Sequence, residues 1–355
     1  MKALSLFSGA GIGEFYLHEL GVDVVIANEI MKSRAVTHSL LYPQCKMLTA
    51  DITDKTTQQR IVEECRKSHI DLIIATPPCQ GLSSAGINKT EKSLLTDSRN
   101  FLILSALSVF DELQPNYFII ENVPRFQQMV FPYNDEYLSL FDLLKKKYGS
   151  TYSVEVSVLN AADYGVPQTR FRVVYRVWRK ELTWALPQKE AQVSLKDAIF
   201  NLPSIEAGES SNIKNHYARP HATNHVECMR YTPTGHSAFT NVEHYPKKKD
   251  GTRIVGYPNS YKRMRWDIPA PTITMRNEIV SSQENVHPGR ENGDGTWSDA
   301  RVLSLRELLI VSSLPPDMDI PSNLSETAFR QLIGEGIPPL MMRKIMKGLC
   351  DANET

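Results

Sequence analysis

Short apolar runs alternate with longer amphipathic segments along the first 180 residues of the chain. The apolar runs are rich in β-branched residues and end in turn residues, which indicates buried strands. Strands are predicted at residues 3–7, 22–27, 71–75, 117–120, 154–159 and 172–177, with a further short element at 50–52. Helices are predicted at residues 14–20, 56–67, 97–113 and 135–147. Alternating strands and helices predict an α/β fold with a doubly wound, mostly parallel sheet.

The pattern changes after residue 177. From 178 to 262 the periodicity is weak and loop-forming residues dominate, whereas helices are predicted again at 304–311, 325–333 and 338–352. We therefore expect a large first domain at 1–177, a smaller loop-rich domain at 178–262, and a segment at 263–355 that returns to the first domain.

A thiol follows one of the predicted strands. The strand at 71–75 leads into Thr76-Pro77-Pro78-Cys79, and the paired prolines stiffen the turn at its carboxyl end. In open α/β sheets, ligands and chemistry lie at that end of the strands. Cys79 is therefore a candidate nucleophile if its surroundings favour the thiolate; the alternative is a half-buried structural thiol.

A carboxylate follows the strand at 117–120. If the two strands are neighbours, their ends place Glu121 and Cys79 in one cleft. A charged side chain at the end of so apolar a strand is either catalytic or part of a structural ion pair, and both alternatives stay open at this point.

The first strand leads into a glycine-rich turn, Ser8-Gly9-Ala10-Gly11-Ile12-Gly13. Glycines permit close backbone approach to a ligand, although such a turn is by itself as easily structural. No Gly-Lys-Ser/Thr follows, so a phosphate-binding P-loop is not expected. Glu29, at the tip of the second strand, lies where such folds bind ribose hydroxyls, and Asp51 follows the third. Together they describe an adenosine-shaped pocket, unless the acids merely cap turns.

Two arginines follow a loop near residue 165. If the segment is extended, Arg170 and Arg172 point the same way, and two guanidiniums suit an anion or a base carbonyl. A solvated arginine pair is the alternative.

The loop-rich segment is basic. Between residues 210 and 280 there are eleven Lys or Arg and five Asp or Glu, a local balance of +6. A positive, loop-rich insert suggests contact with a polyanion such as a nucleic acid. Lys247 to Lys249 could also be a merely solvated run. Five histidines lie here, but their irregular spacing, with only Cys228 near, does not favour zinc, and we expect no metal.

The amino-acid composition indicates which kind of protein this is and in which compartment it is expected. The 355 residues carry a formal net charge of +0 and 41% hydrophobic residues, as in ordinary globular proteins. Five scattered cysteines without a Cys-x-x-Cys argue against a disulfide framework and for a reducing compartment. Nothing resembles a signal peptide, and no apolar run approaches the roughly 20 residues of a membrane span. We expect a soluble protein of the cytoplasm.

Ordered motifs give the chain a resemblance to a known family. They are Phe7-Ser8-Gly9-Ala10-Gly11, Pro78-Cys79-Gln80, Glu121-Asn122-Val123, Gln168-x-Arg170-x-Arg172, Pro269-Ala270-Pro271-Thr272-Ile273, and a Gly-x-x-x-Pro segment from Gly334 to Pro338. In this order the set resembles the C5-specific DNA cytosine methyltransferases of the bacterial restriction–modification type, over residues 1–177 and 262–350. The insert at 178–262 falls where that family carries its target-recognition domain.

The resemblance implies an S-adenosylmethionine-dependent methyltransferase fold and a role for each matched residue. Cys79 would be the nucleophile that adds to cytosine C6, Glu121 the partner of N3, and Arg172 the contact to O2 with Arg170 in support. Contacts to the cofactor would come from Phe7, Ser8, Gly9, Ala10, Gly11, Glu29, Ile30, Asp51, Ile52 and Pro78. The target base would be flipped out of duplex DNA, and a cognate restriction endonuclease would act separately.

One position departs from the family pattern. The last motif usually has Asn where this chain has Glu335, which replaces an amide donor by a carboxylate. Two alternatives remain at this point: an RNA (tRNA) cytosine C5 methyltransferase on the same scaffold, and a catalytically inactive DNA-binding relative.

Overall fold

A computed structural model describes residues 1–78, 101–248 and 250–350 of the chain. The chain divides into two compact units, which we treat separately. Unit 1 comprises residues 1–160, 171–188 and 342–355, and unit 2 comprises 161–170 and 189–341. The dividing points therefore differ from the domain limits expected at 177 and 262, because residues 161–170 pack with unit 2 while 171–188 pack with unit 1.

Unit 1 is built on a sheet in the order β3-β2-β1-β4-β5-β9-β8. The first five are parallel: β1 (Lys2–Leu6), β2 (Asp23–Glu29), β3 (Lys46–Thr49), β4 (Leu72–Ala75) and β5 (Tyr117–Asn122). Strands β9 (Phe171–Arg179) and β8 (Tyr152–Asn160) are antiparallel to their neighbours. The sheet is thus mostly parallel, and the strand order reverses between β1 and β4, where such folds bind ligands.

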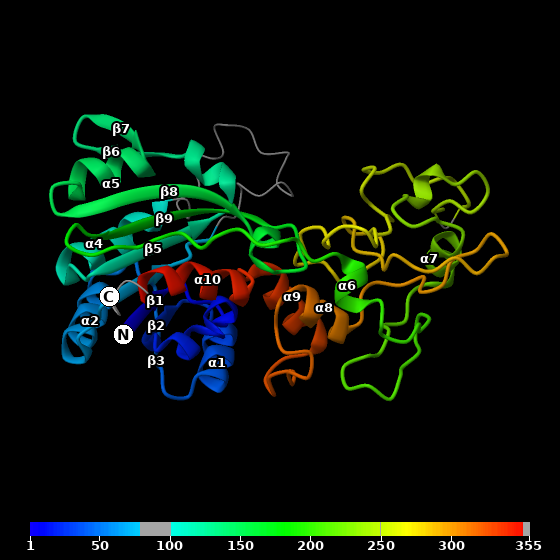
Figure 1. Ribbon diagram of the computed structural model, residues 1–355, viewed down its shortest axis with the longest axis horizontal. Helices are drawn as coiled ribbons and strands as arrows, with labels where there is room; N and C mark the ends of the chain where they lie inside the picture. The colour runs from blue at the N-terminus through cyan, green and yellow to red at the C-terminus, as the bar shows by residue number, and fades with distance from the viewer. Residues whose placement is uncertain (79–100, 249, 351–355) are drawn as a thin grey trace. The chain divides into compact units, whose positions relative to one another are not determined.

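The two faces of this sheet are covered by different helices (Figure 1). Helices α2 (Lys55–Ser68), α4 (Ile103–Leu113) and α5 (Leu140–Tyr148) pack on the face that bears Leu4, Phe118 and Tyr175. Side chains alternate along a strand, so Ser5 and Tyr117 point to the opposite face. There α1 (Lys32–Leu41) and the later turns of α10 (Pro339–Cys350) lie, with the Ile345 carbonyl accepting a hydrogen bond from Trp184.

Small elements complete unit 1. They are the 3-10 helices η1 (Ile12–Glu14), η2 (Leu17–Leu20) and η5 (Pro124–Gln128), and a hairpin of β6 (Val130–Tyr133) with β7 (Glu136–Ser139). Among the described residues no helix is both long and apolar enough to cross a membrane.

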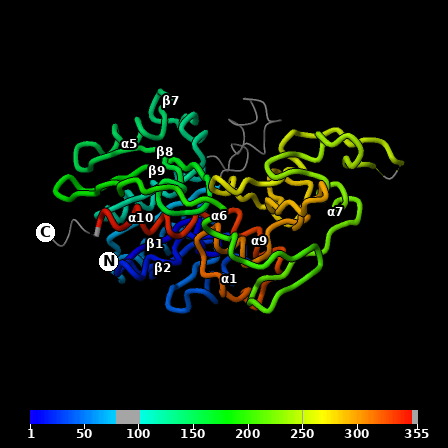
Figure 2. The backbone as a smooth tube through the Cα atoms, turned by 45° about the vertical axis from the view of Figure 1, so that its right-hand side comes forward, coloured from blue at the N-terminus to red at the C-terminus, as the bar shows by residue number. Residues whose placement is uncertain are grey.

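Unit 2 has little regular structure (Figure 2). Its helices are η6 (Ala161–Tyr164), α6 (Leu195–Ile199), α7 (Thr223–Arg230), η7 (Ala238–Thr240), α8 (Leu305–Val311) and α9 (Glu326–Glu335). Its strands are reduced to single bridges, such as Arg263 with Val286. A buried ionic cluster holds it instead: the Arg301 guanidinium donates to both Glu307 and Asp299, and all three side chains are inaccessible to solvent.

Three predicted helices need correction. Residues 14–20 form no α-helix but the short η1 and η2, separated at Phe15 and Tyr16. The helix expected at 135–147 begins only at Leu140, because the residues before it pair as β7 and Ser139 caps the helix. The helix expected at 97–113 is described only from residue 101 onward, and α4 begins at Ile103.

Helix α1 was missed for a physical reason. Its buried positions include Thr37 and His38, whereas Val36 and Leu40 are exposed. The usual apolar stripe of a surface helix is therefore inverted, and its periodicity gives no signal.

Candidate active site

The glycine turn after β1 has the backbone that only a glycine-rich segment adopts readily. Gly9 and Gly11 have φ of 56° and 75°, in the left-handed region, and Phe7 shares it at 57°. A methyl group added at Gly9 would meet no atom within 4 Å, so the outer side of this turn is open to a ligand. Ser8 and Ala10 are buried beneath it.

The buried carboxylate of Glu29 fixes this turn. Its two oxygens accept hydrogen bonds from the backbone N–H of Gly9 at 2.9 Å and of Met31 at 2.7 Å. Each carboxylate oxygen has a second lone pair, so a ribose hydroxyl could still donate to Glu29. The neighbouring Ile30 is 60% exposed although it is large and apolar, as a wall of a ligand pocket would be.

The third strand ends beside this turn. The Asn28 amide donates to the carbonyls of Leu48 and Ala50, which ties β2 to the segment after β3. Asp51 accepts hydrogen bonds from the backbone and hydroxyl of Thr53, and Ile52 is buried. One oxygen of Asp51 therefore caps a turn, which was one of the two roles foreseen for it. An open glycine turn, an acid at the second strand tip and an apolar wall suit a nucleoside such as that of S-adenosylmethionine.

The ends of β4 and β5 lie together. Ala75, the last residue of β4, is paired with Ile120, and β5 continues two residues further to Asn122. Beyond them the Asn122 amide donates to the Pro77 carbonyl at 3.1 Å. On the other side the Thr76 hydroxyl donates to the Phe7 carbonyl at 3.0 Å, which joins β4 to the glycine turn. Pro78 is half-buried, and Cys79 lies outside the described residues.

Glu121 and Arg172 form an ion pair at this edge of the sheet. Arg172 Nε lies 2.7 Å from Glu121 Oε1, and the side chains are 12% and 10% exposed. Glu121 is paired with Val174, and Arg172 lies two residues from that position, so both side chains project from the same face. The foreseen structural pair is therefore present, but at a strand end and beside the segment that leads to Cys79.

Arg170 has a different environment from Arg172. Its buried guanidinium donates to the carbonyls of Ile273, Gly334 and Glu335 at 2.9, 3.0 and 2.9 Å. These partners bring three sequence motifs of unit 2 into one cluster. Because position 335 takes part through its backbone carbonyl, the replacement of the usual Asn by Glu leaves this contact intact.

Only some of the basic side chains of residues 210–280 add positive charge to the surface. Arg263 is buried with its guanidinium on backbone carbonyls, and Arg219, Lys262 and Arg265 have acidic partners. Two histidines are internal as well, since His216 contacts Glu307, and His221 accepts a hydrogen bond from the Val302 amide. Within residues 1–78, 101–248 and 250–350, no three His, Cys, Asp or Glu side chains are grouped to hold a metal ion.

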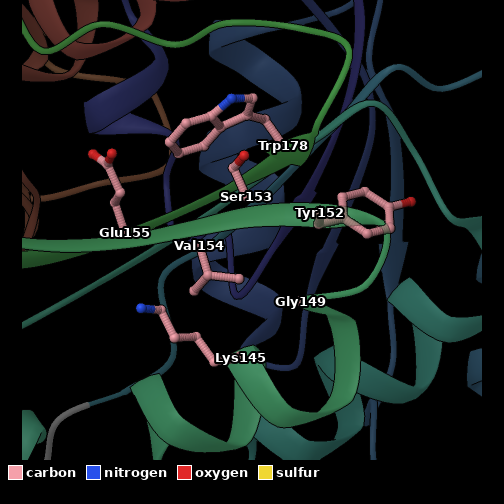
Figure 3. A pocket seen from close by; sticks show the side chains of 7 residues that line it. All are labelled: Lys145, Gly149, Tyr152, Ser153, Val154, Glu155 and Trp178. Atoms are coloured by element: carbon pink, nitrogen blue, oxygen red, sulfur yellow. The ribbon is translucent and has the colours of Figure 1, made fainter.

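A hollow of about 440 Å³ on β8 lies away from this site (Figure 3). Its lining includes Lys145, Tyr152 and Trp178. Trp178 pairs with Tyr117 at the first residue of β5, so the hollow lies at the amino ends of the parallel strands. The groups described above lie at the opposite ends.

Comparisons with known proteins decide what this site belongs to. A model of the C-5 cytosine-specific DNA methylases matches residues 1–350. The chain belongs to this family. It is 45% identical over 353 residues to the Type II methyltransferase M1.HgaI of Avibacterium volantium, with 99% of both chains covered. The Type II methyltransferase M1.HphI of Haemophilus parahaemolyticus is 29% identical, and the match covers 99% of this chain and 87% of that one.

Solved structures agree on the fold. A DNA modification methyltransferase encoded in an Escherichia coli prophage has a TM-score of 0.72 at 21% identity, with both chains covered completely. Spodoptera frugiperda DNMT2 has a TM-score of 0.65 at 18% identity over 98% of this chain and 99% of that one. The expected methyltransferase fold is therefore confirmed.

The resemblance noted in the sequence is confirmed with it. The protein is a DNA (cytosine-5-)-methyltransferase that acts on DNA and uses S-adenosylmethionine. Sequence reasoning did not assign a role to Asn122, which ties the two strand ends, although its place directly after Glu121 was a usable signal. It also missed His38 and Tyr42, which lie on and directly after the undetected helix α1 and face Gly11.

Proposed function

We propose that this enzyme methylates C5 of a cytosine within a specific duplex sequence through a covalent bond between Cys79 and C6. One observation carries the proposal: the Glu121–Arg172 pair lies at the end of β5, and Asn122 holds that end against Pro77, two residues before Cys79.

Glu121 and Arg172 suit the side of the cytosine ring that becomes negatively charged during the reaction. C5 of cytosine is a poor nucleophile, and addition of the Cys79 thiolate to C6 makes it enamine-like. The negative charge that enters the ring is stabilised at N3 and O2, which are attached to the same carbon. Once its carboxyl group has taken up a proton from solvent, Glu121 donates that proton to N3, and the adjacent Arg172 faces O2. One carboxyl group and one guanidinium 2.7 Å apart suit those neighbouring positions.

The later steps return the thiol. When bound, the cofactor supplies an electrophilic methyl group. After C5 has taken it up, a base removes the C5 proton, the C6–S bond breaks, the Cys79 thiolate leaves, and N3 returns its proton to Glu121. These atoms are inaccessible in stacked DNA, so the target base is flipped out of the duplex. Arg170 acts in support by holding the segment that leads into β9.

We infer that the cofactor would lie on the open side of the glycine turn. Glu29 binds the ribose, while Ile30, Ile52 and the phenyl ring of Phe7 border the adenine. Asp51 offers its second oxygen on the adenine side. Gly9 permits close approach of the backbone, and Gly11 gives the turn its left-handed bend. Pro78 would border the cofactor from the segment after β4, with Ser8 and Ala10 filling the turn from below.

Unit 2 is proposed to recognise the DNA sequence, within the insert at 178–262. The support is a hairpin around residues 246–254, in which Lys247 is bridged to Arg253 and the Ile254 amide donates to the Pro246 carbonyl. The Arg253 guanidinium fixes the hairpin to η7 through the carbonyls of Phe239 and Asn241. The major groove admits a two-stranded β-ribbon, and a short hairpin of this kind is narrow enough to enter it.

The surface of this hairpin region has the chemistry of a DNA contact. Lys247 and Lys248 are exposed, and large apolar side chains beside them are unusually accessible: Val242 at 86%, Val255 at 92% and Tyr257 at 68%. Cations suit phosphates, and exposed apolar groups suit thymine methyls and base edges. The hairpin extends at the edge of unit 2 (Figure 2).

The relatives that are Type II methyltransferases support a role in modification beside a separately acting restriction endonuclease. With cellular DNA as substrate, we place the enzyme in the cytoplasm. Bisulfite sequencing of plasmid DNA from expressing cells should show protected cytosines at one short recurring sequence. Conversion of every cytosine would refute the proposal, and a purified enzyme that methylates tRNA in preference to duplex DNA would favour the RNA alternative.

A further inference from the structure

A chain of buried polar groups lies beneath the glycine turn and has no part in the chemistry above. The Ser5 hydroxyl donates to Glu14 Oε1 at 2.5 Å, and His38 Nε2 lies 3.1 Å from Glu14 Oε2. The Tyr42 hydroxyl donates to the Gly11 carbonyl at 2.6 Å. Ser5, Glu14 and His38 are buried, so these contacts are hardly shared with water.

The cluster touches the turn at its tightest point. A methyl group at Gly11 would come within 2.4 Å of the Tyr42 ring and 2.9 Å of the His38 ring. Gly11 therefore has no side chain because these two rings fill its inner side. Its carbonyl accepts from the Glu14 amide as well as from Tyr42, so both lone pairs are used.

We propose that Tyr42, with His38 and Glu14 behind it, is a positioning residue for the cofactor. The inference rests on the proposed placement of S-adenosylmethionine on the glycine turn. Glu29 holds the turn at the Gly9 amide, and Tyr42 holds it at the Gly11 carbonyl from the opposite side. With both ends fixed, the backbone that faces the cofactor is preorganised, and binding does not have to order it.

Tyr42 fits this role because its hydroxyl stays protonated and can always donate the hydrogen bond. Burial, followed by the nearby Glu14 and Cys45, raises the pKa of Tyr42 well above its ordinary value. The phenol therefore keeps its proton throughout the working range. His38 is held between Glu14 and the Tyr42 ring, whose centroid lies 4.8 Å from its own, so Glu14 sets the orientation of His38 and His38 packs against Tyr42.

Tyr42→Phe tests the proposal because it removes one hydroxyl and leaves the ring. We expect the Kd for S-adenosylmethionine, measured calorimetrically on the full chain without DNA, to rise by about 2- to 10-fold, the effect of one hydrogen bond. The methyl-transfer rate at saturating cofactor should change by less than about 2-fold, since Tyr42 acts on binding.

Tyr148→Phe is the matched control. Tyr148 is another tyrosine of unit 1 whose hydroxyl donates a hydrogen bond, to the side chain of Asp111 at 2.7 Å. It should lower Tm about as much as Tyr42→Phe and leave the Kd for the cofactor unchanged. An unchanged cofactor Kd in Tyr42→Phe, with Tm lowered as in the control, would overturn the proposal and leave Tyr42 purely structural.

Two further variants separate the possible failures. Glu14→Gln keeps the size and an acceptor for His38, so it should bind the cofactor several-fold more tightly than Glu14→Ala; equal affinities would contradict the role of Glu14. Glu29→Ala should weaken cofactor binding whether or not Tyr42 is involved. If Glu29→Ala and Tyr42→Phe both bind like wild type, the placement of the cofactor on this turn is wrong, and the inference falls with it.

Discussion

The two units of this enzyme are stabilised in different ways. Unit 1 has a continuous apolar core along one face of its sheet, in which Phe110 packs against Phe118, Tyr148 and Tyr152. Unit 2 has a small apolar cluster around Met229 and Val286, and next to it buries Arg263, Arg301, Asp299 and Glu307. A sheet can bury a whole face of aliphatic side chains, whereas a loop-rich segment must satisfy many irregular backbone groups.

The difference matches the two tasks. In unit 1, the rigid strands fix Glu121 and the turn that leads to Cys79, as a chemical site requires. In unit 2, most guanidiniums are used internally, on carbonyls and acids, and the exposed hairpin near residue 250 is the proposed DNA contact. The predictions below test whether chemistry, stability and DNA recognition separate along this division.

The largest effect is expected in unit 1, from Glu121→Gln. The amide keeps the shape but cannot supply a proton to N3 as an acid does, so the single-turnover methylation rate should fall by about 10²–10⁴-fold. The Kd values for cofactor and for duplex DNA should stay within a few fold of wild type. A variant with a normal rate but weakened DNA binding would make Glu121 a structural acid.

The next effect concerns the ionic core of unit 2. Arg301→Met leaves Glu307 and Asp299 buried without their cation, which should destabilise the protein by about 3–5 kcal/mol. Calorimetric unfolding measures it. Arg265→Met is the control, because the Arg265–Asp267 pair is exposed and its loss should hardly change stability. Equal losses would show that the buried cluster contributes no more than a surface pair.

A moderate effect is expected from Lys247→Ala combined with Lys248→Ala. Each lysine that contacts a phosphate adds about one to the slope of log K against log salt, so the double variant should lose about two. The single-turnover rate on saturating DNA should stay near wild type. Lys189→Ala with Lys214→Ala removes two paired lysines of unit 2 and should leave the slope unchanged. Equal slopes for the two double variants would exclude the hairpin as a phosphate contact.

The smallest effect is on pH dependence. Burial, then Arg301, lowers the pKa of His287 to about 4, and burial, then Arg219, does the same for His221. Both values lie below the unfolded value of about 6.5, so between pH 6.5 and 4 the unfolded chain binds protons that the folded chain does not. The free energy of unfolding should therefore fall as pH drops from 7 to 5. Tm should fall with it, by about 2–4 °C for each kcal/mol of stability lost. A Tm that is constant or higher at pH 5 would contradict this.

Sequence patterns predicted the fold of unit 1 better than its contacts. The strands were predicted correctly because apolar runs such as 72–75 and 117–120 are visible in the local sequence, without knowledge of the strands they pair with. The contact between the end of β5 and Pro77 follows from the parallel strand ends. Helix α1 was missed because it buries His38 and exposes Leu40.

Other contacts could not be predicted because they join distant segments. Arg170 finds its partners 103, 164 and 165 residues further along the chain, and no local pattern announces them. Arg172 reaches Glu121 only because β9 pairs antiparallel with β5. The charge of residues 210–280 was counted correctly, but the internal contacts of Arg263 and Arg219 depend on the tertiary structure.

Covalent trapping tests the central claim most directly. Duplex DNA that carries 5-fluorocytosine at the target site, incubated with the enzyme and S-adenosylmethionine, presents a C5 substituent that no base can remove as a proton. Wild type should therefore accumulate a complex that survives denaturing electrophoresis, and Cys79→Ser should form none while still binding the cofactor. An enzyme that methylates ordinary DNA yet leaves no complex, or a complex that persists in Cys79→Ser, would contradict attack by Cys79 on cytosine C6.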